Sequence, residues 1–417
     1  MMFWKRYYYS YLESFVQSLL LPGECSFRVN PSQTAKKKVA PLPTDEWNYI
    51  VASDILGHVH DIDTFFLGAG AALAPDGRLI ITQYSTLWEP VLRLASKLGM
   101  RNQVIEQNWL TKNDIKNFAT LAQFEVVRMG TKMIAPIYLP IISVFLNQFL
   151  SNLWPFNHLG LFNFFVLRKV QRPNQQNLPS ISIVVPALNE MGTIEKIARE
   201  LPQLGSGTEI IFIEGNSTDK TYAEIERVAR AYGATRKIKF AQQSGRGKGD
   251  AVRCGFELAT GDILAIYDAD MTVPPEEMDK FFRAIVSYQA DFINGSRLVY
   301  PMEKESMRLL NFLGNKFFSS AFSWILGQQL KDTLCGTKVL WRKDYQKIIR
   351  NRKFFGDFDP FGDFDLLFGA AKLNLKIIDL PVHYRERVYG ATNIRRIAHG
   401  WLLIKMVIFA LKKIKFI

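Results

Sequence analysis

Residues 181–217 read ISIVVPALNEMGTIEKIARELPQLGSGTEIIFIEGNS. Two short apolar runs, 181–185 and 209–213, enclose a segment at 194–201 whose apolar residues recur with helical spacing. Short apolar runs separated by a helical pattern are typical of parallel strands joined by a crossover helix. The same alternation continues through further apolar runs at 238–240, 263–267 and 292–294. This part of the chain is therefore predicted to be an α/β domain with a mostly parallel sheet.

Residues 171–180, QRPNQQNLPS, form a polar stretch with two prolines and are expected to be a linker. The block before it holds apolar runs that predict buried strands at 49–53, 78–83 and 124–128, with helices at 61–73 and 88–98. We therefore expect a second α/β half-fold in front of the linker. A chain of 417 residues is long enough to form two domains, each with its own hydrophobic core.

The composition indicates which binding partners and which cellular compartment suit this chain. Fifty-two Lys and Arg against thirty-nine Asp and Glu give a formal net charge of +13, which favours polyanionic partners such as phosphates, nucleic acid or an acidic membrane face. The three cysteines form no CxxC pair, so neither a disulfide framework nor a cysteine zinc site is indicated, and a reducing cytosol fits best. The N-terminal apolar stretch is interrupted by Glu13, Gln17 and Ser18 and no small-residue cleavage site follows it, so we expect no signal peptide. The apolar stretches at 134–146 and 401–410 are also interrupted, so we expect no membrane-spanning segment.

Polar residues follow the predicted strands at the edge where a parallel sheet holds its ligand. Asp268 and Asp270 stand two residues apart at the end of the apolar run 263–267. Two adjacent carboxylates repel each other unless a cation lies between them, and hard oxygen ligands suit Mg²⁺ or Mn²⁺. The alternative is a solvated pair that caps the helix beginning near Pro274. The spacing alone leaves both interpretations open.

Residues 244–250, SGRGKGD, place glycines and two cations, Arg246 and Lys248, before a predicted helix at 251–258. Backbone N–H groups at such a helix start favour an anion. The segment is not a Walker A loop, because Gln242 and Gly249 stand where that motif needs Gly and Ser or Thr. A flexible basic turn is the alternative.

Six motifs in order resemble those of glycosyltransferase family 2, which has the GT-A fold. Within that family they resemble the branch that transfers sugars to polyprenyl phosphates, such as dolichol-phosphate mannosyltransferase. The motifs are VVPALNE at 184–190, EGNSTD at 214–219, GRGKGDAV at 245–252, DAD at 268–270, NGSR at 294–297 and DTLCGTK at 332–338. The resemblance covers about residues 181–406.

The resemblance implies a site for a nucleotide-diphosphate sugar. It places around the donor Pro186, Ala187, Leu188, Asn189, Glu190, Glu214, Asn216, Asp219, Lys248, Asp268, Arg297 and Asp332. It also implies that Asp268 faces the ribose or the metal, that Asp270 holds a metal bridging the diphosphate, and that Arg297 binds the diphosphate. Two positions depart from the family pattern: the chain has Glu214-Gly215 where the family often has Asp-Asp, and Thr272 where it often has a Gln ligand.

An inverting transfer to an alcohol needs a base for the acceptor hydroxyl. The candidate is Asp363, because residues 361–367, FGDFDLL, resemble the family's acidic motif that opens a helix in the acceptor region. A phosphate acceptor is already anionic, so the carboxylate would then orient it instead. The alternatives nearby are Asp357, Asp359 and Asp365.

Residues 384–393 resemble the loop that closes over the donor and acceptor phosphates in this branch. The resemblance implies that Arg385 and Arg387 clamp those phosphates. Related enzymes often have Ser-Lys where this chain has Thr392-Asn393, and Arg395 and Arg396 are candidate replacements. Residues 401–417 mix apolar side chains with lysines, a pattern that can lie in a membrane interface, as can 315–326 beside it. An ordinary core helix is the alternative for both.

Residues 45–168 resemble the second half of a class I S-adenosylmethionine-dependent methyltransferase. The matching stretches lie at 47–66, 74–99, 107–118 and 124–128. Such domains bind their cofactor through a glycine-rich turn, and residues 21–32 contain no such turn. The domain is therefore expected to be truncated, and no S-adenosylmethionine is expected as a cofactor.

The expected organisation is a degenerate segment at 1–44, a truncated methyltransferase-like domain at 45–170, a linker at 171–180, a GT-A domain at 181–394 and a basic amphipathic membrane-interface segment at 395–417. The expected function is that of an inverting hexosyltransferase, using Mg²⁺ or Mn²⁺ to move one sugar from a UDP- or GDP-sugar to a polyprenyl phosphate. We expect it to be cytoplasmic and peripheral on the inner face of the cell membrane. The alternatives are a polysaccharide or another lipid as acceptor, or a non-catalytic scaffold. No nucleic-acid partner is expected, because no recognised nucleic-acid module is found.

Overall fold

The structure is a computed structural model. It describes residues 3–29, 42, 45–99, 108–173, 177–300, 309–352, 364–387, 389–390 and 396–416. The chain divides into two compact units, which we call the front unit (1–171 with 411–417) and the rear unit (172–410). Within the described ranges, no helix is both long enough and apolar enough to cross a bilayer.

The front unit is built on a five-stranded sheet in the order β1-β2-β3-β5-β4. Its strands are β1 (Ser26–Arg28), β2 (Trp47–Ser53), β3 (Leu73–Tyr84), β4 (Phe124–Lys132) and β5 (Phe162–Lys169). The first three run parallel, whereas β5 is antiparallel to both of its neighbours. The three strands predicted from apolar runs are β2, β3 and β4. The resemblance of this unit to a methyltransferase stays a prediction.

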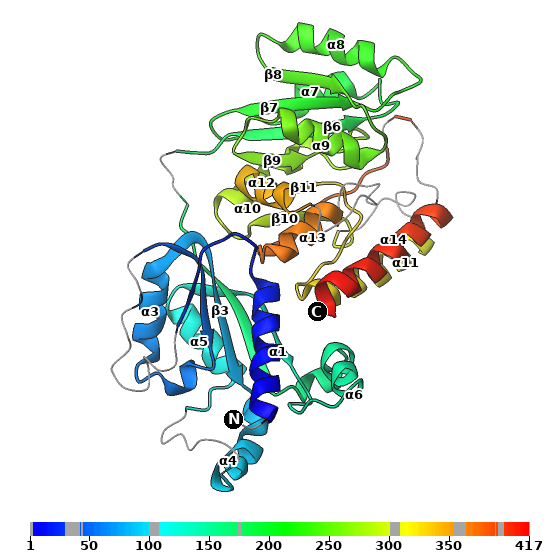
Figure 1. The fold of residues 1–417 in the computed structure, drawn as a ribbon. Coiled ribbons are helices and arrows are strands. Elements are labelled where there is room, and N and C mark those ends of the chain that lie inside the picture. The colour runs from blue at the N-terminus through cyan, green and yellow to red at the C-terminus, as the bar shows by residue number, and fades with distance from the viewer. Residues whose placement is uncertain are drawn as a thin grey trace. The chain divides into compact units, whose positions relative to one another are not determined.

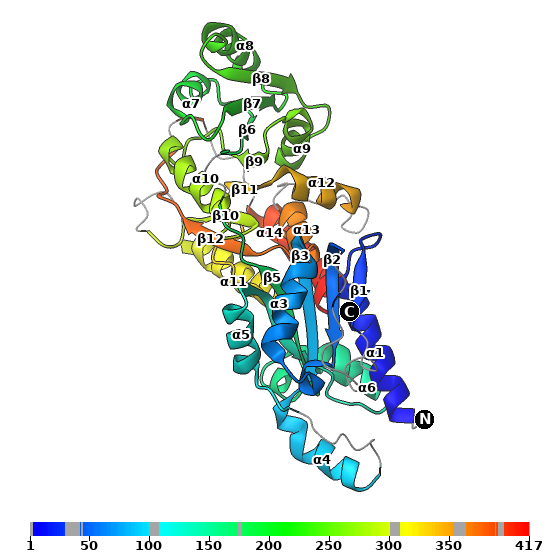
Figure 2. The same cartoon turned by 90° about the vertical axis from the view of Figure 1, so that its left-hand side faces the viewer.

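Helices cover both faces of the front sheet (Figures 1 and 2). On one face lie α3 (Ile62–Ala72) and α5 (Lys112–Leu121), whose apolar side chains share a core with alternate residues of the strands. On the other face lies α1 (Phe3–Leu19), where the rings of Phe15 and Phe164 are 4.8 Å apart. The predicted helix at 88–98 is α4 (Glu89–Lys97).

The rear unit has a seven-stranded sheet in the order β12-β10-β11-β9-β6-β7-β8. Its strands are β6 (Ile181–Ala187), β7 (Thr208–Glu214), β8 (Lys237–Gln242), β9 (Ile263–Ile266), β10 (Phe292–Ser296), β11 (Lys338–Trp341) and β12 (Ile377–Pro381). Strands β9, β6, β7 and β8 are mutually parallel, and β11 is antiparallel to both β9 and β10. The predicted α/β class with a mostly parallel sheet is confirmed.

Helices follow the rear strands as the alternating pattern predicted. They are α7 (Ile194–Glu200), α8 (Thr221–Tyr232), α9 (Lys248–Leu258), α10 (Met278–Val286), α11 (Leu309–Leu326), α12 (Arg342–Arg350), α13 (Phe364–Lys372) and α14 (Arg396–Ala410). Helix α9 lies against β6 (Figure 1), and a Cβ on Gly255 would come within 2.3 Å of the Val184 side chain. Only glycine permits this close approach of the helix to the strand.

Glu209 on β7 is a buried carboxylate surrounded by donors. Its oxygens accept from the ammonium groups of Lys239 at 2.8 Å and Lys237 at 3.0 Å and from the Ser182 hydroxyl at 2.6 Å. Burial raises the pKa of Glu209, but these donors outweigh burial and lower its pKa to about 2. A carboxylate with a lowered folded-state pKa stabilises the fold above its ordinary pKa of 4.5, and this contribution is lost as the pH falls toward 2.

Glu209→Gln should therefore lower the unfolding free energy by on the order of 2 kcal/mol at pH 7. Because the variant has no carboxylate to protonate at this position, it should lose no further stability from this site as the pH falls. Urea unfolding between pH 7 and pH 3 measures both effects. The matched control is Glu226→Gln on α8, where the carboxylate is 3.6 Å from Arg230 at the surface. If wild type and Glu209→Gln lost equal stability between pH 5 and pH 3, the role given to these donors would be wrong.

Candidate functional site

The parallel strands β6, β7 and β9 end at one edge of the rear sheet, and the predicted donor residues follow them. Pro186 and Ala187 are the last residues of β6, and Leu188 beyond them is exposed. Asp268 and Asp270 follow β9. The sheet therefore brings the polar residues after its strands to one edge, as predicted.

Hydrogen bonds of Asn189 connect the loop after β6 to the loop after β7. Its side-chain oxygen accepts from the backbone N–H groups of Thr218 at 2.8 Å and Asp219 at 3.3 Å. The backbone N–H of Asn189 donates to the Ser217 hydroxyl at 3.0 Å. Asn189 has a φ of 56°, a left-handed conformation that Asn tolerates better than most residues. Asp219 in turn accepts from the backbone of Thr221 at the start of α8 at 2.9 Å. These residues hold the loops in one shape.

Glu214 ends β7 with its carboxylate buried. One oxygen accepts from the backbone N–H of Ser217 at 2.5 Å, and the other from the Gln242 amide at 2.9 Å. The same amide of Gln242 also lies 3.3 Å from the side-chain oxygen of Asn216. The predicted donor residues Glu214 and Asn216 thus lie together with Gln242, a residue that the motifs did not single out as a ligand.

Lys248 and Asp268 form an ion pair at this edge. The Lys248 ammonium is 2.6 Å from an Asp268 oxygen. Burial raises the pKa of Asp268, but the charge of Lys248 outweighs burial and the net pKa is lowered. A Cβ on Gly336 would lie 2.0 Å from Asp268 and 2.3 Å from the Lys248 ammonium, so a larger residue at this position would displace the pair. The glycine-rich segment therefore presents Lys248 to a carboxylate from the first turn of α9.

Asp270 is bound on both oxygens. One accepts from the backbone and hydroxyl of Thr272 at 3.1 and 2.9 Å, and the other from the Arg387 guanidinium at 3.0 Å. Burial raises the pKa of Asp270, and the neighbouring charge of Asp268 raises it further. Thr272, which stands where the family often has a Gln ligand, orients Asp270 in this structure.

Arg387 also reaches the loop after β6. Its second terminal nitrogen donates to a Glu190 oxygen at 2.5 Å, so one guanidinium bridges two carboxylates. Burial raises the pKa of Glu190 to about 7, against the opposing effect of Arg387. A Cβ on Gly192 would come within 2.5 Å of the Tyr389 ring, so Tyr389 packs directly on the β6 loop.

Arg385, the second predicted clamp, points elsewhere. Its guanidinium is 3.3 Å from Glu276, in an exposed ion pair, while its backbone N–H donates to the Thr272 carbonyl at 2.8 Å. Of the two arginines, only Arg387 contacts the carboxylates that follow the strands.

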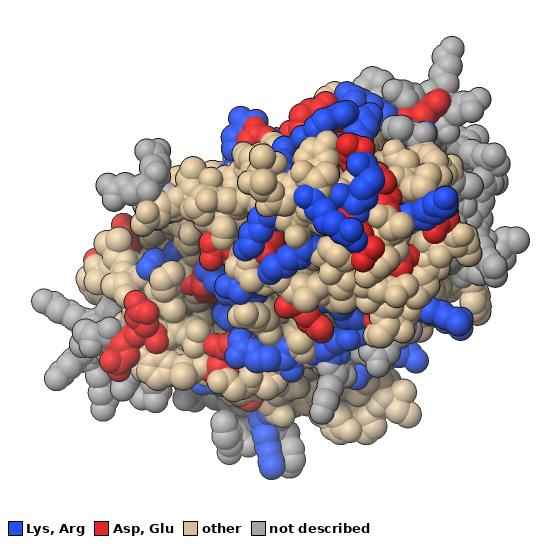
Figure 3. Space-filling model, turned by 90° about the horizontal axis from the view of Figure 1, so that it is seen from above, with Lys and Arg blue, Asp and Glu red and all other residues tan. Residues whose placement is uncertain are grey.

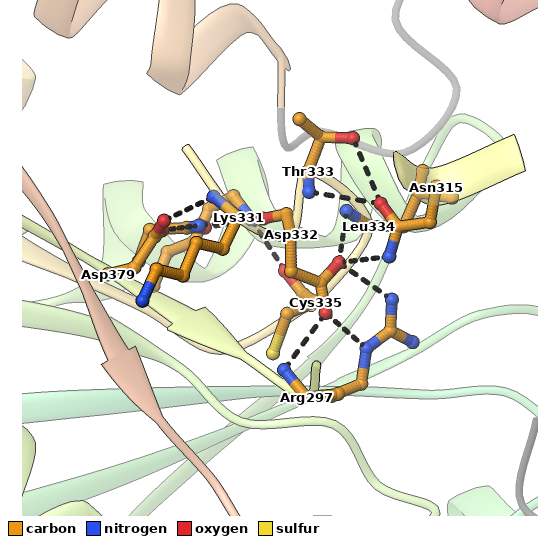
Figure 4. Close-up of polar contacts among 10 residues, drawn as sticks. Arg297, Asn315, Lys331, Asp332, Thr333, Leu334, Cys335 and Asp379 are labelled. Atoms are coloured by element: carbon orange, nitrogen blue, oxygen red, sulfur yellow. Dashed lines mark hydrogen bonds and ion pairs between the residues drawn. The ribbon is translucent and has the colours of Figure 1, made fainter. Parts of the chain in front are cut away.

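Arg297 forms a separate ion pair with the fully buried Asp332, shown in Figure 4. The Arg297 Nε and one Nη donate to the two Asp332 oxygens at 2.7 and 2.9 Å, and the Arg297 backbone N–H adds a third bond at 3.0 Å. Asn315 on α11 donates to the same carboxylate at 2.7 Å. Burial raises the pKa of Asp332, but Arg297 outweighs it and lowers the pKa to about 2. Two of the donors that would bind a diphosphate are thus taken by Asp332, and that role for Arg297 stays a prediction.

The candidate base lies outside the described residues. Asp363 and the alternatives Asp357 and Asp359 belong to a range that the structure does not describe. Asp365 is in the first turn of α13, where its carboxylate lies 3.6 Å from Arg352 and 3.9 Å from Arg253. Thr392, Asn393 and Arg395 are also outside the described residues.

The fit of a divalent cation can be judged from the two carboxylates after β9. In the described part of the chain, no group of three or more His, Cys, Asp or Glu side chains is placed to hold a metal ion. Asp268 and Asp270 are nevertheless two half-buried carboxylates, and each is already matched by a cation of the chain. Mg²⁺ is usually held by one or two carboxylates with substrate phosphates completing its shell. The residues therefore fit a cation that arrives with a phosphorylated ligand.

Surface charge near the rear unit is mixed in sign. On the face seen in Figure 3, Lys and Arg side chains lie interspersed with Asp and Glu. Ion pairs on the helices of the rear unit include Arg227 with Glu224 and Arg283 with Asp279. The excess positive charge therefore does not form a one-signed field over this face.

Residues 182–364 match the model of glycosyl transferase family 2. The rear unit therefore contains a family 2 glycosyltransferase domain, as its motifs predicted. From Haloferax volcanii, the low-salt glycan biosynthesis hexosyltransferase Agl6 is 27% identical over 238 residues, which cover 55% of this chain and 53% of the relative. The glycosyltransferase AglJ of the same organism is 28% identical over 229 residues, 54% of this chain and 69% of the relative.

Among solved structures, glucosyl-3-phosphoglycerate synthase of Mycobacterium tuberculosis is similar to 56% of this chain and 80% of its own. The TM-score is 0.42 and the identity 19%, too distant a likeness to carry a conclusion about substrate. This chain thus spans about half the length of the first curated relative, and the residues that match the family model lie within the rear unit.

Proposed function

We propose that the rear unit transfers one hexose, with inversion, from a UDP- or GDP-sugar to a polyprenyl phosphate at the cytoplasmic face of a membrane. The observation that carries the proposal is the acidic pair Asp268 and Asp270 at the carboxyl edge of a parallel sheet, with Lys248 and Arg387 beside it. An edge that offers both carboxylates and cations suits a diphosphate that binds together with a divalent ion.

Asp268 and Asp270 would hold Mg²⁺ or Mn²⁺, which would neutralise charge on the departing diphosphate. Lys248 lies at the start of α9 within 2.6 Å of Asp268, so its ammonium is placed to attract a diphosphate oxygen. Thr272 fixes the direction of Asp270 through two hydrogen bonds. The loops at Asn189 and Glu214, which hydrogen bonds hold in place, would contact the nucleotide and fix its orientation.

Helix α14 supports the choice of a lipid acceptor. Its Leu403 and Met406 are buried, whereas Trp401, Ile404 and Ile408 are exposed large apolar side chains spaced along the helix. Lys405 is exposed among them. An apolar face with adjacent cations is typical of helices that lie in a membrane interface. In this proposal α14 brings the rear unit to the surface where a polyprenyl phosphate is embedded.

The test incubates the purified chain and Mn²⁺ or Mg²⁺ with a panel of UDP- and GDP-sugars, with and without polyprenyl phosphate, and measures nucleoside diphosphate release. Release that depends on the lipid is the expected result. Release that depends instead on an added polysaccharide or a diacylglycerol lipid would assign a different acceptor. No release from any sugar nucleotide would overturn the proposal.

Arg387→Ala should lower kcat/KM for the donor by about 10- to 100-fold, because it removes the guanidinium that connects the closing loop to Glu190 and Asp270. Arg385→Ala is the matched control for the donor, since its guanidinium faces Glu276 instead. Steady-state kinetics with varied sugar nucleotide compare the two. Equal donor kinetics for both variants would show that Arg387 does not act at the donor.

A further inference from the structure

The front unit carries a long uncharged segment between β4 and β5. Residues 133–167, from the position after Lys132 to the one before Arg168, include no Asp, Glu, Lys or Arg. The part at 137–159, which we call the apolar insert, contains α6 (Ile142–Val144) and a π-helical turn at Phe145–Phe149, followed by two short 3₁₀ turns. Segments this short and irregular cannot span a bilayer.

The apolar insert buries polar side chains and exposes apolar ones, which is the reverse of an ordinary helix in a soluble protein. Its buried side chains are polar: Ser143, Asn147 and Ser151, spaced four residues apart, are at most 1% exposed. Asn147 accepts from the backbone N–H groups of Ile134 at 2.9 Å and Ala135 at 2.8 Å, and the Ser151 hydroxyl donates to the Asn147 carbonyl at 2.5 Å. The polar side chains are thus used internally to satisfy the backbone.

The outward side chains of the apolar insert are large and apolar. Ile141 is 83% exposed and Trp154 is 79% exposed. The others exposed in the same segment are Ile137, Tyr138, Leu139, Ile142, Val144, Phe145, Phe149, Leu153, Phe156 and Leu159. Soluble proteins rarely leave so many neighbouring apolar side chains in water unless another surface covers them. Polar groups inside and apolar groups outside are what a lipid environment selects.

Cations lie directly beside this surface. The rings of Phe149 and Phe416 are 4.8 Å apart, so the C-terminal segment, whose Lys412 and Lys413 are exposed, lies next to the apolar insert. An apolar surface bordered by two exposed lysines is complementary to an anionic bilayer.

We propose that the apolar insert docks the front unit on an anionic lipid bilayer, with Ile141 and Trp154 immersed below the headgroups and the C-terminal lysines on lipid phosphates. Tyr138 and Trp154 have the amphipathic rings that favour the boundary between headgroups and acyl chains. This inference goes beyond the proposed function, because it gives a role to the front unit and does not depend on sugar transfer.

The test is co-sedimentation of the full chain with vesicles of phosphatidylcholine alone or with added phosphatidylglycerol. The variant Ile141→Asp/Trp154→Ser should bind anionic vesicles at least about tenfold more weakly than wild type. Leu121→Asp, at a 74% exposed position at the end of α5, is the matched control and should bind like wild type. Both side chains are largely exposed, at 83% and 79%, so their replacement removes little packing and the variant is not expected to unfold.

A second measurement does not depend on that variant. Quenching of tryptophan fluorescence by brominated lipid should be strong in wild type and reduced in Trp154→Phe. Two outcomes would overturn the proposal: vesicle binding that is absent or equal in wild type and variant, or a dimer that Ile141→Asp/Trp154→Ser separates in solution. The second outcome would assign the surface to another copy of the chain. Failure of sugar transfer, with vesicle binding intact, would affect only the proposed function.

Discussion

Asp270→Asn should reduce sugar transfer by at least about 1,000-fold, because it removes half of the negative charge that would hold a divalent ion against the diphosphate. Asn keeps an oxygen that can accept from Thr272, so the loop after β9 is expected to keep its shape. Activity measured at saturating Mn²⁺ and donor separates loss of chemistry from weaker binding.

The stability of the same variant gives a second readout. Burial and the charge of Asp268 raise the pKa of Asp270, which means that its ionised form is less favourable in the folded chain than in water. Replacing this charge should leave the melting temperature unchanged or raise it. Asp279→Asn, at an exposed ion pair on α10, is the control for loss of one carboxylate and should keep full activity. Transfer by Asp270→Asn at the wild-type rate would remove Asp270 from the mechanism.

Asp332→Asn should lower the free energy of unfolding by about 3 to 5 kcal/mol, because it leaves the Arg297 guanidinium buried without its counter-charge. The Asp332 side chain is fully buried and that of Arg297 is 13% exposed. The carboxylate accepts from Arg297, Asn315 and the Leu334 backbone together. An amide has one oxygen where the carboxylate has two, so it cannot accept all of these bonds. Urea unfolding measures the loss.

The interpretation of that loss needs two controls. Replacing both partners, as Arg297→Met/Asp332→Leu, should recover part of the stability, since no buried charge is then left unpaired. Breaking the exposed pair of α10 by Asp279→Asn should cost less than about 1 kcal/mol. If Asp332→Asn were no more costly than Asp279→Asn, the pair between Arg297 and Asp332 would not contribute to the fold as described.

Five strands of the rear unit, β6 to β10, could be predicted because each contains a short apolar run between polar segments. The order of motifs also predicted which residues meet at the carboxyl edge, and Asp268, Asp270 and Lys248 do meet there. Strand β11 could not be found in this way, because its four residues begin with a buried lysine, Lys338. Strand β5 is not among the predicted strands, although it is a nearly continuous apolar run.

The pairings within the site could not be predicted, because they join residues far apart in the sequence. Arg387 lies 117 positions from Asp270 and 197 from Glu190, and no local pattern indicates that one guanidinium bridges them. Asn315 lies in an apolar helix, where a single amide gives no signal of its role beside Asp332. Likewise, a composition count shows that residues 133–167 lack charge, but only the structure shows that their polar side chains face inward.

A diphosphate and a divalent ion are expected to bind together at the carboxylates after β9. Calorimetric titration of the full chain with UDP and with GDP, each in Mn²⁺ and in EDTA, tests this most directly. We predict that at least one nucleotide binds in Mn²⁺, that EDTA abolishes the binding, and that Asp270→Asn abolishes it as well. Equal affinity in Mn²⁺ and EDTA, or no binding of either nucleotide, would contradict the account.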